Sequence, residues 1–131
     1  ILERGGCVAM YCEGSRSRDG RLADRPKPGI GKLALETGAA VVPVAIYGSA
    51  KVRNWRKGEF PKVTVQYGDP IRWEAAETPS RDQQMAVADD IFSEIKVLHA
   101  GLESLGRKGV MQRVREQRRL ERRGKKHAAT A

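Results

Sequence analysis

Cysteine and histidine, which most often build disulfide frameworks and zinc sites, are scarce in this 131-residue sequence, with two of each. Cys7 and Cys12 lie five residues apart on one expected strand, so about 16 Å separates them at ~3.3 Å per residue. They cannot pair within that strand, and we expect two reduced thiols, of which Cys7 belongs to the core. The histidines and cysteines also lack the spacing of zinc ligands. We therefore expect no disulfide framework, no metal and no cofactor.

Long hydrophobic runs are also missing. The longest uncharged stretch, residues 37–50, has fourteen residues and contains Pro43, whereas a spanning helix needs roughly 20. Charged residues make up 31% of the sequence, and the mean hydropathy is −0.55. No stretch of this sequence is predicted to span a bilayer.

Positive charge is abundant, but it is unevenly distributed. The formal net charge is +9; residues 107–131 hold ten Lys or Arg and two Glu, whereas residues 1–106 hold fifteen basic and fourteen acidic side chains. We predict one nearly neutral domain, residues 1–106, followed by a basic tail, residues 107–131, that is disordered or helical. Such a tail could bind anionic lipid or nucleic acid. No zinc finger, helix-turn-helix or aromatic-rich sheet motif supports the nucleic-acid alternative.

A polar, turn-rich loop begins where the apolar run of residues 7–11 stops. The run predicts a strand buried on both faces, which puts the loop, residues 13–20, at its carboxyl end. Ligands bind at such ends in open α/β sheets. Arg16 offers a planar, permanently charged fork for a phosphate, and Glu13 could hold Arg16, hold a loop N–H, or receive a glycerol hydroxyl. The alternative is that both side chains only stabilise the turn.

Helix and strand signals follow this loop. Pro28 predicts the start of a helix that runs to about Thr37 and ends at Gly38, and its amino terminus could share a phosphate with Lys27 and Arg16. Residues 41–47 predict a central strand with Pro43 near its beginning. Strand, helix and strand in succession predict a right-handed parallel crossover and hence an α/β fold.

The second half of the domain predicts a strand and a long helix. Residues 62–67 alternate, with Val63, Val65 and Tyr67 on the dry face. Ser80 and Gln83 have the spacing of a capping box at the start of the longest helix, which Gly106 and Gly109 close. One face of that helix carries an apolar core stripe, formed by Ala88, Ile91, Phe92, Ile95, Leu98, Leu102 and Leu105. His99 adjoins this stripe, and we expect it to be a packing residue.

Residues 49–62 place basic side chains around Trp55 and Phe60. This composition suits a membrane interface, where aromatic rings lie at headgroup depth. An ordinary exposed loop whose aromatic residues cover the core explains it equally well.

Three short motifs resemble the glycerolipid acyltransferase family, which includes the 1-acylglycerol-3-phosphate acyltransferases. They are Glu-Gly-Ser-Arg-Ser at 13–17, Lys-Pro-Gly at 27–29 and Val-Pro-Val at 42–44, and the resemblance covers about residues 2–71. Cys12 stands where the family usually has Pro, and Ser15 stands for Thr while keeping its hydroxyl. In the family the first block binds the glycerol phosphate headgroup, and the Val-Pro segment helps to shape the acceptor site. The resemblance therefore implies a substrate site formed by Glu13, Gly14, Ser15, Arg16, Ser17, Lys27, Val42 and Pro43.

The resemblance also implies a reaction and a fold. Family members transfer an acyl group from acyl-CoA or acyl-carrier protein to a lysophosphatidate-like acceptor in phospholipid biosynthesis. We accordingly expect a partial mixed or parallel sheet with crossover helices, as in the lysophospholipid acyltransferase fold. An anionic membrane surface is the expected partner, and the cytoplasmic face of a membrane, by peripheral association or an anchor, is the expected location.

The family's catalytic motif, a His and an Asp separated by four intervening residues, is absent from this sequence. Its histidines are His99 and His127, and position 104, where the Asp would follow His99 in this spacing, is Ser104. We expect the chain to be the carboxyl-terminal part of an acyltransferase, to supply no catalytic residue and to be inactive alone. A small nucleic-acid-binding or membrane-surface module without catalysis is the alternative.

Overall fold

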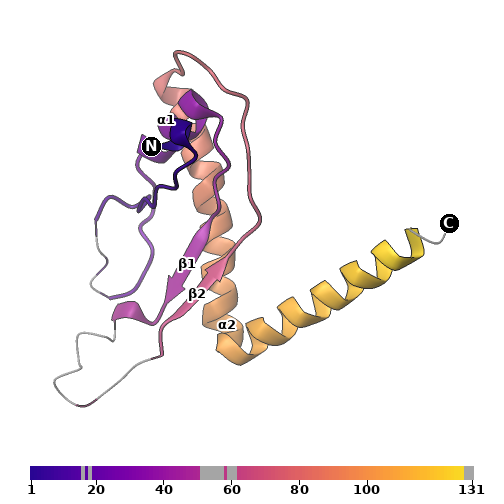
Figure 1. The fold of residues 1–131 in the computed structure, drawn as a ribbon. Coiled ribbons are helices and arrows are strands. Elements are labelled where there is room, and N and C mark those ends of the chain that lie inside the picture. Colours follow the sequence, from indigo (N-terminus) through magenta and orange to yellow (C-terminus); the bar gives the residue numbers. More distant parts are fainter. Residues whose placement is uncertain (16, 18, 51–57, 59–61, 129–131) are drawn as a thin grey trace. The chain divides into compact units, whose positions relative to one another are not determined.

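The computed structural model describes residues 1–15, 17, 19–50, 58 and 62–128, with side chains through Arg122. The chain forms two compact units, Ile1–His99 and Ala100–Ala131. Arg16, Trp55 and Phe60, which carry predictions made above, lie outside the described residues. Figure 1 shows the elements in chain order: the short 3₁₀ helix η1 (Leu2–Arg4), α1 (Gly29–Thr37), β1 (Val44–Tyr47), β2 (Thr64–Tyr67) and α2 (Arg81–Ala128).

Helix α1 has the boundaries that its sequence predicts. Pro28 occupies the N-cap position, and Gly38 ends the helix with φ 60° while its N–H donates to the Ala34 carbonyl at 2.9 Å. The helix lies close against α2, because a Cβ added at Gly31 would overlap the Gln84 carbonyl oxygen. Only glycine at this position permits such a backbone approach.

The amino-terminal part of α2 supplies the other side of the core of the first unit. Its capping box is formed as predicted: the Ser80 N–H donates to Gln83 Oε1 at 2.8 Å, and the Gln83 N–H donates to Ser80 Oγ at 3.2 Å. The buried cluster contains residues from the loop, α1 and α2, namely Cys12, Ile30, Ala34, Leu35, Val87, Ala88, Ile91 and Phe92. The predicted stripe on α2 is thus confirmed at Ala88, Ile91 and Phe92, and His99 is buried with its ring 5.6 Å from that of Tyr47.

The sheet of the described residues differs from the predicted one. Strands β1 and β2 pair antiparallel, with Ile46 opposite Val65, and an isolated bridge joins Val41 to Ile71. The expected parallel crossover is not formed by the described residues, because residues 7–11 form no strand beside β1. Strand β1 is also not a central strand buried on both faces, since Ile46 is exposed. Strand β2 is the next strand along the chain, and antiparallel neighbours need no crossover connection. Pro43 does precede β1, and its carbonyl accepts the Gly68 N–H at 2.9 Å.

Residues 7–11 are irregular and exposed instead of forming a buried strand. Val8, Met10 and Tyr11 have exposed fractions of 40%, 45% and 79%. A strand is stabilised by a hydrogen-bonded neighbour, and the described part of the chain places none beside this run. The thiol assignment is also corrected, because Cys7 is exposed and Cys12 is buried.

The inner face of the β1–β2 pair is the reverse of the predicted one. Gln66 lies opposite Ala45, the residue of β1 that packs inward. Because side chains alternate along a strand, Thr64 and Gln66 share this inner face, and Val65 and Tyr67 point outward and are exposed. The side-chain oxygen of Gln66 is buried and, among the described residues, has no hydrogen-bond partner.

The second unit, Ala100–Ala131, contains the rest of α2. Gly106 has non-helical angles, φ 62° and ψ 176°, at the position where the sequence predicts a helix end. The chain is helical again from Arg107 to Ala128. No helix in the described part of the chain has the length and apolar character required to cross a membrane.

Candidate functional site

The polar loop of residues 12–27 closes on itself. The Lys27 N–H donates to the Cys12 carbonyl at 2.7 Å. Gly14 has φ 71°, and a Cβ added there would lie 3.0 Å from Cγ of Lys27, so the Lys27 side chain lies over Gly14. Two residues of the predicted substrate site, thirteen positions apart, are thus brought into contact.

Glu13 holds the returning segment of this loop, residues 21–24. Its Oε2 accepts the Ala23 N–H at 2.7 Å in a partly buried setting. A carboxylate acceptor makes such a bond about twice as strong as a neutral one. Of the three duties expected for Glu13, holding a loop N–H is the one for which the described atoms show a contact.

Helix α2 fixes the same stretch from the other side. Lys96 Nζ donates to the Asp24 carbonyl at 3.0 Å, and Leu22 packs against the buried cluster. No sequence pattern connects Lys96 with the loop, because 72 residues separate it from Asp24. Residues 22–24 are therefore fixed by Glu13, by Lys96 and by the core.

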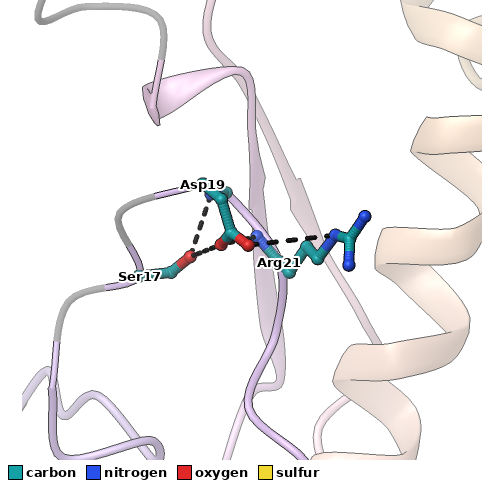
Figure 2. Close-up of polar contacts among 4 residues, drawn as sticks. Ser17, Asp19 and Arg21 are labelled. Carbon is teal, nitrogen blue, oxygen red and sulfur yellow. Dashed lines mark hydrogen bonds and ion pairs between the residues drawn. The ribbon is translucent and has the colours of Figure 1, made fainter.

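The tip of the loop is a turn stabilised by its own polar groups (Figure 2). Ser17 Oγ donates to Asp19 Oδ1 at 2.8 Å and accepts the Gly20 N–H at 2.9 Å, and the Arg21 N–H donates to Asp19 Oδ1 at 3.1 Å. Arg21 Nε also lies 3.8 Å from Asp19 Oδ2. The Ser17 hydroxyl, followed by the Arg21 N–H, lowers the pKa of Asp19. The Asp-Gly pair predicts a turn, but not that Asp19 organises it.

The remaining residues of the predicted acceptor block are exposed or undescribed. Ser15 is exposed, and Arg16, the residue proposed to grip the phosphate, lies outside the described residues. The role assigned to Arg16 therefore stays a prediction. The structure does fix the residues on both sides of it, through Glu13 and Ser17.

Cys12 anchors the start of the loop in the core. Its side chain is buried. Burial raises the pKa of the thiol; its backbone hydrogen bond partly offsets the increase, and the neighbouring Glu13 carboxylate adds to it. Cys12 is therefore a protonated packing residue, located where the family usually has proline.

The Val-Pro segment lies in the first unit with the loop but on a different element. Pro43 is fully buried just before β1, and Val42 is exposed. Their neighbour Val41 packs against the cluster that contains Cys12. The core thus connects the Val-Pro segment to the base of the loop.

The amino end of α1 adds anion-binding capacity next to Lys27. Pro28 forms no side-chain cap hydrogen bond, and the helix begins at Gly29. The first N–H groups of a helix lack intrahelical partners and carry partial positive charge. That Lys27 and this helix end share a phosphate stays a prediction. Within the described ranges, no cluster of three or more Cys, His, Asp and Glu side chains could hold a metal ion.

Comparison with known proteins agrees with these motifs. The family model named Acyltransferase matches residues 1–47, which include the whole loop and end at the last residue of β1. Curated proteins of the same kind match 110 residues, or 81% of this chain, at 33% identity. The chain belongs to the acyltransferase family, as its motifs predict.

The relatives are named for one reaction. Two are 1-acyl-sn-glycerol-3-phosphate acyltransferases of Limnanthes douglasii and Limnanthes alba, and this chain spans 37% of the length of each. A chloroplastic 1-acyl-sn-glycerol-3-phosphate acyltransferase of Arabidopsis thaliana is 42% identical over 52 residues, which are 40% of this chain and 14% of the relative. No solved structure matches the chain significantly.

Proposed function

We propose that the protein containing this chain transfers an acyl group from a thioester donor to a 1-acylglycerol 3-phosphate-like acceptor, and that this chain binds the acceptor. Family membership and the relatives' names support the reaction. The observation that carries the assignment to this chain is the closed loop, in which Glu13 and Lys27 of the family's motifs are both fixed. The lysophospholipid acyltransferase fold is part of the same proposal.

The acceptor's phosphate would bind between Lys27 and the amino end of α1. Lys27 supplies a full positive charge over Gly14, and the free N–H groups of α1 begin two residues later. Arg16 would add a bidentate contact. Among the described residues, the Glu13 carboxylate accepts the Ala23 N–H and forms no ion pair with a cation.

The chemical step in this proposal needs a general base that this sequence lacks. A histidine of the family's His-x4-Asp motif, oriented by its aspartate, would take the proton of the acceptor hydroxyl. The oxygen would attack the thioester carbonyl, and the thiolate of acyl-CoA or acyl-carrier protein would leave. General-base catalysis contributes ~10²–10⁴-fold, so this chain alone would bind the acceptor without robust turnover. No metal or cofactor has a role in these steps.

The proposal also includes a location and a partner. Acceptor and product are membrane lipids, so the protein would act at the cytoplasmic face of a membrane, and an anionic bilayer surface would be its partner.

Titration with sn-glycerol 3-phosphate tests the acceptor site, because this probe is the headgroup without an acyl chain. Lys27→Gln should weaken binding about tenfold or more, since a hydrogen bond to a charged group contributes ~1.5–3 kcal/mol. Lys32→Gln is the matched control, because Lys32 is an exposed lysine on α1 that pairs with Glu36 at 3.6 Å. It should change the dissociation constant less than twofold. Equal losses in the two variants, or equal binding of glycerol, would overturn the proposal.

A further inference from the structure

The helix that follows Gly106 presents a charged face that the proposed acceptor site does not use. Six exposed cations fall within about a third of the circumference at 3.6 residues per turn; we call this set the cationic stripe, Arg107, Lys108, Arg115, Arg118, Arg119 and Arg122. It extends about 22 Å at 1.5 Å per residue. Among the described side chains, Arg113 is the cation on the opposite arc, and Val110 and Val114 lie between Arg113 and Arg107 around the helix.

The acidic residues of this segment do not neutralise the stripe. Glu116 and Glu121 lie on other arcs of the helix. Each accepts a hydrogen bond from a glutamine four residues earlier, at 3.1 Å from Gln112 and at 3.2 Å from Gln117. The ion pairs of the described residues are Arg21–Asp19 and Lys32–Glu36, so none involves the stripe.

The stripe also has an apolar residue at its centre. Met111 has an exposed fraction of 42% and lies between the cations. A hollow of about 340 Å³ is lined by Lys108, Met111, Gln112 and Arg115. This combination provides two cations for headgroup phosphates and one flexible apolar side chain for the boundary with the acyl region.

We infer that the cationic stripe is an electrostatic docking surface for an anionic lipid bilayer. A straight helix with its positive charges on one side can place all of them on a flat anionic surface together. Single-stranded nucleic acid is less well matched, because it binds to aromatic stacking platforms and the sequence from Ala100 onward contains no Phe, Tyr or Trp. The choice of lipid rests on the proposed function, in which the substrate is a membrane phospholipid. The residues of the cationic stripe would bring the enzyme to the membrane that contains this substrate.

Vesicle co-sedimentation tests the inference with the full chain and phosphatidylcholine vesicles with and without phosphatidylglycerol. Arg115→Gln removes one cation from the stripe and should lower the partition coefficient about fivefold, because each basic residue near an anionic surface contributes ~1 kcal/mol. Arg113→Gln is the matched control on the opposite arc. At about 0.1 M salt it should cost less than twofold, because the helix is ~10 Å wide and the Debye length is also ~10 Å.

Several outcomes would overturn the inference. Equal losses in the two variants would mean that the segment acts as a diffuse polycation, without a specific face. Binding that ignores phosphatidylglycerol, or tighter and stripe-dependent binding of an RNA or DNA oligonucleotide, would exclude a lipid surface. Circular dichroism should show unchanged helicity in both variants. The sn-glycerol 3-phosphate titration separates the two proposals, because Arg115→Gln should leave it unaltered.

Discussion

Two consecutive segments, residues 7–11 and residues 12–27, differ in opposite ways from what their sequences predict. The first is apolar and predicts a buried strand, yet it is irregular and exposed. The second is polar and rich in turn residues, yet specific contacts fix both its ends, its return and its tip. A strand depends on partners elsewhere, whereas a side chain such as Asp19 can order backbone close to it in sequence.

The largest effect is expected where α1, the helix that follows the loop, packs against α2. Gly31→Ala would place a methyl group against the Gln84 carbonyl and force α1 away from α2. We expect a loss of about 3 kcal/mol in the free energy of unfolding, at the upper end of overpacking costs. Gly29→Ala is the control, because a Cβ there meets nothing within 4 Å, and it should change stability by less than about 1 kcal/mol. Equal stability of the two variants in denaturant unfolding would show that α1 does not approach α2 closely.

A smaller effect is expected from the bond that fixes the return of the loop. Glu13→Ala leaves the partly buried Ala23 N–H without its acceptor and should cost about 1–3 kcal/mol. Glu13→Gln retains an acceptor oxygen and should cost less than about 1 kcal/mol. Hydrogen exchange of the Ala23 amide provides the local measurement, and it should accelerate in Glu13→Ala only.

The control for this pair is Glu3→Ala, because Glu3 is an exposed glutamate of η1. It should change stability by less than about 0.5 kcal/mol. If the Ala23 amide exchanges equally fast in wild type and in Glu13→Ala, the Glu13 carboxylate does not order the loop.

The smallest effect is expected in the apolar run. Val8→Ser and Met10→Ser replace exposed side chains, so each should change the free energy of unfolding by less than about 0.5 kcal/mol. Losses above about 2 kcal/mol would mean that the run is buried as its sequence predicts, and the contrast between the two segments would disappear.

Elements whose signals are local could be predicted from the sequence. Pro28 and Gly38 mark α1, and Ser80 with Gln83 starts α2, because caps act over a few residues. The inner face of the β1–β2 pair could not be predicted, because it depends on register, which places Gln66 opposite Ala45.

The candidate site likewise has features that the sequence predicts and contacts that it does not. Its motifs identify the family, and the Asp-Gly pair identifies a turn. The contacts from Glu13 to Ala23 and from Lys96 to Asp24 join residues 10 and 72 positions apart. No short-range pattern encodes them.

The different settings of Cys7 and Cys12 give the chain two built-in chemical probes. Only a thiolate attacks alkylating reagents efficiently, so exposed Cys7 should react readily, while Cys12 is shielded and its raised pKa keeps it protonated. Modification of Cys12 then requires the base of the loop to open, and its rate relative to that of Cys7 measures the free energy of this local opening. Because the Glu13 contact lies next to Cys12, a ligand that holds the loop closed would slow the reaction of Cys12 and leave that of Cys7 unchanged.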